Sequence, residues 1–368
     1  METDQPLESA VLLINPTRYP GYVRALKRLV KQRRIPQVVE TRDRTHFAEA
    51  VKEFCRGPYS YLLVWGGDGT AHLAINAMMD AGCDPRKSVG FLRGGTGNGI
   101  QDSYNVPYGL SRQIRTYAHS ISRGLTVKVD LLRVRERNTV RYGQLVGLGF
   151  DARVLELREA TAGTRRRSSG FLGYARAATR AFTGRFFEDL QPFRLVLRDG
   201  KYAYRGPRIN AEYSFGSLAR TTKAPMIELG TRPYYGKLFK VCPDVVCNDG
   251  NLDCYVFDIR HRRAIAMNLS VLWRGKHDVL NRRLIARRQG MIERYEVKEA
   301  EVACARPFDF HVDGERLRAQ AVDGQAEVAV SVVPEALRFL VPDNFYRLFH
   351  PFDYDRSFER YVSNSKGE

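Results

Sequence analysis

The chain has 368 residues, with 59 Lys and Arg against 41 Asp and Glu, so its formal net charge is +18. This length predicts two domains, and the positive charge predicts an anionic partner such as a nucleotide or a membrane surface. No apolar run is long enough to span a bilayer and the first residues do not form a signal peptide, so we expect a cytoplasmic protein that associates peripherally with membranes.

Predicted strands and helices alternate from residue 9 to about residue 123. Apolar runs predict strands at residues 10–14, 38–39, 62–65 and 89–92. Helical periodicity predicts helices at residues 22–34, 45–55 and 110–121. Such alternation is typical of an open, mostly parallel sheet with helices on both faces. We therefore predict an α/β nucleotide-binding domain at residues 1–125.

The period of the hydrophobic pattern changes near residue 126. Residues 126–134 and 140–146 alternate between apolar and polar side chains, as half-buried strands do. Asp-Gly pairs, which favour hairpin turns, follow at 199–200, 249–250, 313–314 and 323–324. These features predict a mainly antiparallel β-sandwich domain at residues 126–342. Residues 343–368 are predicted to return to the first domain.

One helical segment interrupts the β-rich half. Its apolar side chains share one face, and Arg165-Arg-Arg167 precede them: Phe171, Tyr174, Ala175, Ala178, Phe182 and Phe186. Packing onto the β domain and binding to a membrane surface both fit this pattern. A second helix is predicted at residues 261–273, and Arg274-Gly-Lys-His277 follow it.

Two glycine-rich turns follow the strands at residues 62–65 and 89–92. They are Gly66-Gly-Asp-Gly-Thr70, which leads into a helix, and Gly94-Gly-Thr-Gly-Asn-Gly99. Glycine lets the backbone approach a ligand closely, and a helix N-terminus offers N–H groups to a phosphate. Asp68 would repel phosphates without a cation between them, so the first turn predicts Mg²⁺. An ordinary turn also explains the first motif alone, but two such turns at one sheet edge favour a phosphate site.

These turns, together with Asn15-Pro16 after the first strand, resemble the diacylglycerol kinase catalytic-domain family of lipid kinases. That family shares a superfamily with NAD kinases and with sphingosine and ceramide kinases. The chain lacks the Asn-Glu motif of NAD kinases in a comparable place. The resemblance implies that ATP is bound by Asn15, Gly66, Gly67, Gly69, Thr70, Gly95, Thr96, Gly97 and Asn98.

Later segments continue the resemblance in the family's order. Val129-Asp-Leu131 implies a catalytic role for Asp130, and Asp313-Gly-Glu315 implies that Glu315 is the general base. Gly147-Leu-Gly-Phe-Asp-Ala152 matches a glycine-rich family segment. Residues 243–253 resemble a loop that binds a structural Mg²⁺ in bacterial members, where Asp249 would supply a carboxylate and Val246 and Asn251 their backbone carbonyls. Read locally, Asp313-Gly314 and Asp249-Gly250 are also plain turns, and Asp130 could simply pair with an arginine.

The resemblance implies ATP- and Mg²⁺-dependent transfer of a phosphoryl group to the hydroxyl of a membrane lipid such as diacylglycerol. Asp68 would bind Mg²⁺, and Asp130 would orient Glu315 or the waters on the metal ion. Two positions depart from the family: Gly99 replaces a frequent acidic residue, and Arg93 replaces a usual proline. The alternatives are therefore a catalytically weak homologue that binds lipid or nucleotide, and a kinase of a sphingoid base, ceramide or monoacylglycerol.

The six cysteines are scattered and form no Cys-x-x-Cys pair, so we expect reduced thiols and no zinc site. The chain carries no helix-turn-helix, zinc-finger or aromatic RNA-binding signature, so nucleic acid is not an expected partner. The sequence leaves the oligomeric state open, including a homodimer.

Overall fold

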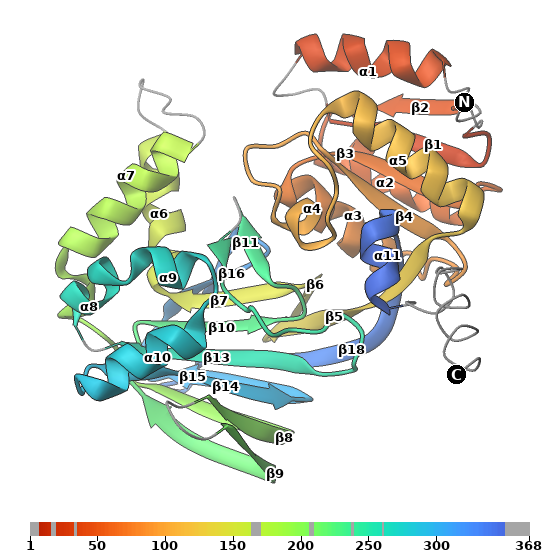
Figure 1. Ribbon diagram of the computed structural model, residues 1–368. Helices are drawn as coiled ribbons and strands as arrows, with labels where there is room; N and C mark the ends of the chain where they lie inside the picture. Colours follow the sequence, from red (N-terminus) through yellow and green to blue (C-terminus); the bar gives the residue numbers. More distant parts are fainter. Residues whose placement is uncertain are drawn as a thin grey trace, which may run out of the picture.

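The computed structural model describes residues 7–15, 20–32, 35–162, 171–205, 210–236, 239–259 and 261–349. The chain folds into an α/β domain and a larger β-rich domain, which lie side by side (Figure 1). A single 16-stranded sheet runs through both domains. Within the described residues, no helix is long and apolar enough to cross a membrane.

The first domain is built on four parallel strands in the order β2-β1-β3-β4. These are β1 (Ala10–Ile14), β2 (Gln37–Glu40), β3 (Tyr61–Gly66) and β4 (Ser88–Arg93). The helices around them are α1 (Pro20–Gln32), α2 (Arg44–Arg56), α3 (Asp68–Asp80), α4 (Gly99–Ser103) and α5 (Leu110–Arg123). The run Leu62–Trp65 on β3 is almost fully buried, because helices cover both faces of a parallel sheet. The predicted α/β fold is confirmed.

The strands of the second domain pair antiparallel to one another, as the alternating pattern predicts. They are β5 (Thr126–Glu136), β6 (Thr139–Gly143), β7 (Leu145–Gly149), β8 (Phe193–Arg205), β9 (Asn210–Thr222), β10 (Met226–Gly230), β13 (Leu252–Ile259), β14 (Gly290–Val297), β15 (Glu299–Cys304), β16 (Phe308–Val312), β17 (Glu315–Ala319) and β18 (Ala326–Leu340). A separate small sheet joins β11 (Tyr234–Gly236) and β12 (Phe239–Lys240).

The long strand β18 joins the two domains. It pairs antiparallel with β5 and β15 in the second domain and parallel with β4 in the first. After it, α11 (Asp343–Phe349) packs on the first domain, where the rings of Phe345 and Tyr104 lie 5.0 Å apart. The sheet therefore fixes the two domains relative to each other, and α11 adds a second contact. The remainder of the predicted C-terminal segment lies outside the described residues.

Helices form one flank of the second domain (Figure 1). They are α6 (Phe150–Ala162), α7 (Phe171–Thr183), the short 3₁₀ helix η1 (Arg185–Phe187), α8 (Arg262–Met267), α9 (Leu269–Trp273) and α10 (His277–Ala286). Ala177 and Ala181 on α7 are buried against Val154 and Leu157 on α6. Tyr174 and Ala178 of the predicted apolar face are partly buried against the same cluster, which supports packing, while binding of this helix to a membrane stays a prediction. The arginines at 165–167 lie outside the described residues.

Two expectations from the sequence are wrong. Asp199-Gly200 is not a hairpin turn, because β8 runs through it and the pairing with β9 skips Asp199, whose φ is 50°. The register is the same on either side of this residue, since Arg198 pairs with Ser217 and Gly200 with Phe215, so the left-handed backbone at Asp199 does not end the strand. Secondly, not all cysteines are free thiols: Cys55 and Cys83 form a disulfide. The end of α2 and the turn after α3 bring their Cα atoms to 4.9 Å, within the range that a disulfide requires.

Candidate active site

A cavity of about 450 Å³ lies where the two domains meet. Asp68 and Glu315 both line it, although they are far apart in sequence. Eight of the nine predicted nucleotide-binding residues also line it: Asn15, Gly66, Gly67, Gly69, Thr70, Gly95, Thr96 and Gly97. The tertiary structure therefore gathers the N-terminal motifs and the late Asp-Gly-Glu motif at one place.

The two glycine turns touch through their backbones. Gly94 N–H donates to the carbonyl O of Gly66 at 2.8 Å, and Asp68 N–H donates to that of Gly97 at 3.2 Å. A Cβ on Gly67 would lie 2.8 Å from the Cα of Gly95, which leaves no room for a side chain. Glycine is therefore needed here for the packing of one turn on the other.

Asn98 is the predicted nucleotide-binding residue that does not line the cavity. Its side chain closes the second turn, with Nδ2 donating to the carbonyl O of Gly95 at 3.0 Å and Oδ1 accepting from Gly95 N–H at 3.3 Å. Its contacts are those of a residue that shapes the turn. The first glycine-rich turn runs directly into helix α3, which begins at Asp68. Gly69 and Thr70 therefore lie in the N-terminal helical turn of α3.

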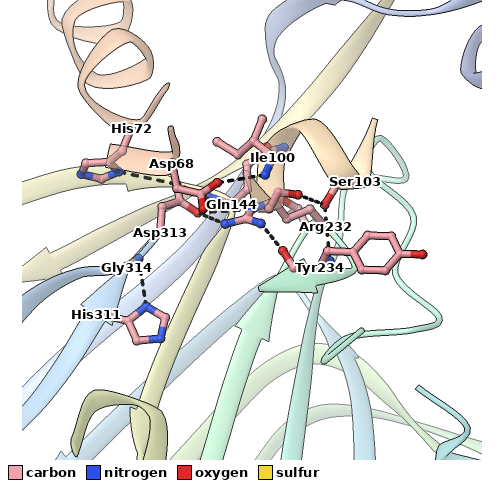
Figure 2. A network of polar contacts seen from close by, with 12 residues as sticks. Asp68, His72, Ile100, Ser103, Gln144, Arg232, Tyr234, His311, Asp313 and Gly314 are labelled. Atoms are coloured by element: carbon pink, nitrogen blue, oxygen red, sulfur yellow. Dashed lines mark hydrogen bonds and ion pairs between the residues drawn. The ribbon is translucent and has the colours of Figure 1, made fainter. Parts of the chain in front are cut away.

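Asp68 lies in a buried polar network, shown in Figure 2. Its Oδ1 accepts the backbone N–H of Ile100 at 3.1 Å. Burial raises the pKa of Asp68 to about 6, and the nearby guanidinium of Arg232 only partly opposes this rise. A second carboxylate, that of Asp313, lies close to Asp68 in Figure 2 and pairs with Arg232.

Arg232 and Asp313 form a buried ion pair, with Nη2 and Oδ1 3.0 Å apart and side-chain exposures of 1% and 0%. Asp313 also accepts the backbone N–H of Gln144 at 3.1 Å and lies 3.5 Å from Nδ1 of His72. Burial alone would raise the pKa of Asp313, but Arg232 and His72 outweigh it and lower the pKa to about 2. The environment therefore shifts the pKa values of these two neighbouring carboxyl groups in opposite directions. Asp68 is protonated more easily than usual, and Asp313 less easily.

Glu315 is the first residue of β17, directly after the two-residue turn Asp313-Gly314. Both turn residues have positive φ, 50° and 86°, as a tight hairpin requires. The Glu315 carboxylate accepts hydrogen bonds from Nη2 of Arg44 at 3.1 Å and lies 3.4 Å from Nε2 of His72. The motif is thus both a hairpin turn and a way to present an acid to the cavity.

The cavity suits a divalent cation at Asp68. Three carboxylates line it, and both Asp313 and Glu315 form ion pairs with arginines of the described chain, whereas Asp68 does not. Mg²⁺ binds few protein carboxylates and takes its remaining ligands from water and phosphate. Asp68 thus fits the predicted role of a magnesium ligand beside a nucleotide.

Asp130 is not placed to orient Glu315, contrary to the expectation from the sequence. It is fully buried, does not line the cavity, and accepts backbone N–H groups of Gly250 at 2.6 Å and Glu335 at 2.7 Å. Because its strand β5 pairs with β18, its side chain faces the loop before β13 rather than the glycine turns. Its catalytic role stays a prediction without a supporting contact.

The loop that carries Val246, Asp249 and Asn251 forms a local turn. Oδ1 of Asp249 accepts the backbone N–H of Asn251 at 2.9 Å, and Lys298 donates to the carbonyl O of Gly250. Val246 is 41% exposed. Lys298 thus places a positive charge beside this turn. The predicted structural Mg²⁺ of this loop therefore stays a prediction, and no chemical step depends on it.

A second polar cluster, around His311, contacts the Asp313–Glu315 turn. Nε2 of His311 donates to Asp151 of the Gly-Phe-Asp-Ala segment, and Nδ1 accepts the backbone N–H of Gly314 at 3.3 Å. Burial raises the pKa of the adjacent Glu228 well above its usual value, so Glu228 can donate a proton to Asp151. Both imidazole nitrogens of His311 are thus engaged, and the cluster holds the turn in place.

Sequence reasoning missed three residues of the site: Arg44, His72 and Arg232. His72 follows Asp68 by four residues on α3, so helical spacing could have placed both on one face. Arg44 begins α2, and only the folded chain brings it to Glu315. No local pattern marks Arg232.

Gly99 departs from the family pattern, and the structure shows what occupies the space beside it. A Cβ on Gly99 would lie 2.8 Å from Nη1 of Arg232 and 2.9 Å from the carbonyl O of Tyr235. The missing acidic side chain therefore leaves no gap, because Arg232 packs there. The charges of Asp68 and Asp313 both act on this arginine.

Comparisons with known proteins agree with this architecture. Residues 9–134 match the diacylglycerol kinase catalytic domain, and residues 144–341 match the YegS C-terminal NAD kinase beta sandwich-like domain. A Streptococcus pneumoniae protein named "Putative lipid kinase" is 29% identical over 153 residues, which are 39% of this chain. The match spans about half (47%) of that relative's length.

Solved structures from Bacillus anthracis str. Sterne share the fold. One, described as a "putative diacylglycerol kinase", has a TM-score of 0.61 at 16% identity and covers 94% of this chain and 98% of its own. Another, described as a diacylglycerol kinase, has a TM-score of 0.56 at 14% identity and covers 92% and 98%. From the two domain matches, this chain belongs to the lipid kinase family that joins a diacylglycerol kinase catalytic domain to a YegS-type C-terminal domain.

Proposed function

We propose that the protein is an ATP-dependent lipid kinase that phosphorylates the hydroxyl of a membrane lipid such as diacylglycerol. One observation carries the proposal. The phosphate-type glycine turns with Asp68 come from one domain, Glu315 comes from the other, and all line a single cavity. Phosphoryl transfer needs charge neutralisation on one side and an oriented acceptor oxygen on the other.

The first domain would hold the nucleotide. The N-terminal turn of α3 and the second glycine turn offer backbone N–H groups to phosphates, and Thr70 and Thr96 add hydroxyls. Asn15 supports this wall by donating from Nδ2 to Oγ1 of Thr70 at 3.4 Å. Mg²⁺ bound by Asp68 would neutralise phosphate charge.

Glu315 would accept the proton of the lipid hydroxyl while the hydroxyl oxygen forms a bond to the γ-phosphorus and ADP leaves. Its carboxylate now contacts Arg44, whose side chain is 70% exposed and can move away without leaving a buried charge. His72 would then keep Glu315 oriented from its buried position between Asp313 and Glu315.

The test is incubation with γ-labelled ATP, Mg²⁺ and mixed micelles that contain diacylglycerol, monoacylglycerol, sphingosine or ceramide, followed by chromatography. We expect one labelled lipid. Glu315→Gln should lower turnover by about 100- to 10,000-fold, as expected for loss of a general base, with little change in nucleotide affinity. Glu335→Gln is the matched control, since Glu335 pairs with Lys128 at the surface.

Two outcomes would count against the proposal. Unchanged turnover in Glu315→Gln would remove Glu315 as the base. Nucleotide binding without any labelled lipid would favour the catalytically weak homologue, for which Gly99 is the one sequence observation.

A further inference from the structure

The short helices α8 and α9 carry a cluster of exposed apolar side chains. Met267, Leu269 and Trp273 are 68%, 53% and 36% exposed. The other exposed large hydrophobic residues of the described chain stand singly on separate segments. Single exposed hydrophobic residues are ordinary, whereas a cluster within a few residues indicates a contact surface.

The fold of this segment forces these side chains outward. Ala264, Asn268 and Leu272 recur every four residues and are all buried. Nδ2 of Asn268 donates to the carbonyl O of Ala264 at 2.8 Å, and its Oδ1 accepts from Nη1 of Arg283 on α10 at 3.1 Å. Since Asn268 points inward at the break between α8 and α9, its neighbours Met267 and Leu269 face solvent.

Positive charge surrounds the apolar cluster. Residues 261–288 contain seven arginines and one lysine but a single acidic residue, Asp278, which pairs with Arg282 at 3.2 Å. Arg263, Arg274 and Lys276 are exposed, and none forms an ion pair with a described residue. We call Met267, Leu269 and Trp273 with these three cations the α8–α9 tip.

The tip is connected to the wall of the cavity. Arg262 at the start of α8 pairs with Glu188 at 2.7 Å and lies over the ring of Phe187 in η1. Helix α7 precedes η1 and carries Tyr174, which lines the cavity. In Figure 1 these helices form one flank of the second domain. A surface that rests on the tip would therefore contact the same flank that bounds the site.

We propose that the α8–α9 tip docks on an anionic membrane surface. The inference rests on the proposed function, in which the acceptor is a membrane lipid. Apolar side chains beside basic ones suit the interface between acyl chains and anionic headgroups, and tryptophan favours that depth. Nucleic acid would use the cations but leave the apolar cluster without a partner, and a second copy would bring like charges together.

Tryptophan fluorescence tests the depth of docking directly. The chain has two tryptophans, and Trp65 is buried in the first domain with 1% exposure, so Trp273 supplies the solvent-sensitive signal. We expect a blue shift and quenching by brominated lipid when phosphatidylcholine vesicles contain phosphatidylglycerol. The Trp273→Phe variant should lose both signals. A signal that does not respond to anionic vesicles would overturn the inference.

Vesicle sedimentation separates the apolar part from the charged part. Arg274→Gln with Lys276→Gln should weaken binding by about 30-fold, since each cation contributes a factor of about five near such a surface. Met267→Ser with Leu269→Ser should weaken binding by about tenfold or more. Raising salt from about 0.1 M to about 1 M should release the wild type from the vesicles, because the added ions screen the attraction between the cations of the tip and the anionic headgroups.

The matched control is Tyr213→Ser with Val322→Ser, which removes two exposed apolar side chains, 63% and 50% exposed, from other segments. This control should bind vesicles like the wild type. Equal binding by the tip variants and the wild type would exclude the tip as the docking surface. Dimerisation that the Met267→Ser, Leu269→Ser variant abolishes would assign the tip to a second copy instead.

The docking inference and the kinase proposal can fail separately. With a short-chain, water-soluble diacylglycerol and no vesicles, the tip variants should turn over like the wild type. With long-chain diacylglycerol in anionic vesicles they should be slower by the same factor as their binding is weaker. If no lipid is phosphorylated, the kinase proposal fails. The vesicle-binding measurements still show whether the tip is the docking surface.

Discussion

Asp68 and Asp130 belong to two acidic regions that differ in what their carboxylates contact. Asp68 lines the cavity, and of the two carboxylate oxygens one is held by Ile100 N–H. Asp130 is fully buried, and each of its oxygens accepts a backbone N–H. A carboxylate with both oxygens committed to the backbone stabilises a loop, whereas one that faces a cavity can bind a ligand. The family pattern implies function for both, and their surroundings separate them.

The largest expected effect is on Asp68. Replacement Asp68→Asn should lower lipid phosphorylation by about 100- to 1000-fold, because it removes the ligand that neutralises developing phosphate charge. The measurement is kcat at saturating Mg²⁺ in the micelle assay. The far-UV spectrum should be unchanged. Full activity in this variant would remove the distinction between Asp68 and Asp130.

The pH dependence of Asp68 adds a second measurement. Burial raises its folded pKa from 3.8 to about 6, so the folded state binds this proton more tightly than the unfolded chain. That contribution to stability is complete below pH 3.8 and is lost as pH rises through about 6. Relative to Asp68→Asn, the wild type should therefore lose free energy of unfolding between these pH values. If the free energies of unfolding of the wild type and Asp68→Asn, measured with urea, differ by the same amount at every pH, the assignment is contradicted.

The next effect concerns the buried ion pair of Arg232 with Asp313. Arg232→Met leaves the charge of Asp313 buried without its partner, which should lower the free energy of unfolding by about 3–5 kcal/mol. Arg198→Met is the matched control, because Arg198 pairs with Glu301 at the surface at 3.2 Å, and it should cost at most about 1 kcal/mol. Equal urea midpoints for both variants would mean that Arg232 does not hold the site together.

A smaller effect is expected at Gly99. Gly99→Ala puts a Cβ 2.8 Å from Nη1 of Arg232 and should cost about 1–3 kcal/mol by overpacking. Gly69→Ala has nothing within 4 Å of the new Cβ, so its stability should stay within about 1 kcal/mol of the wild type. Thermal unfolding of both proteins measures the difference. A fully stable Gly99→Ala protein would show that Arg232 moves aside easily.

The smallest effect on turnover is expected at Asp130. Asp130→Asn keeps one carbonyl acceptor but loses the other, so it should lower the free energy of unfolding by about 1–3 kcal/mol. Turnover per folded molecule should stay near the wild-type value. The check is kcat corrected by the folded fraction from urea unfolding at the assay temperature. A stable Asp130→Asn protein without activity would restore its catalytic role.

The sequence alone determined the local parts of the molecule. Glycines after two buried strands can only form close turns, and helical and alternating periods are set by residue spacing, so β3, α3, β4 and the Asp313-Gly314 hairpin were all predictable. The helices around residues 150 and 280 and the disulfide were missed, because their patterns are weak or depend on distant partners.

Only the tertiary structure decided which acids share a site. Strand β18 lies beside β4 on one side and β5 on the other and so joins the domains, which leaves Glu315 of β17 in the cavity and Asp130 of β5 outside it. Arg232, buried in a pair with Asp313 and close enough to Asp68 to feel its charge, has no local signal, since the need for a buried cation arises only when two distant carboxylates meet. The local turns and their acidic residues could therefore be predicted from the sequence. The charged partners of those acids could not, because they depend on the packing of the two domains.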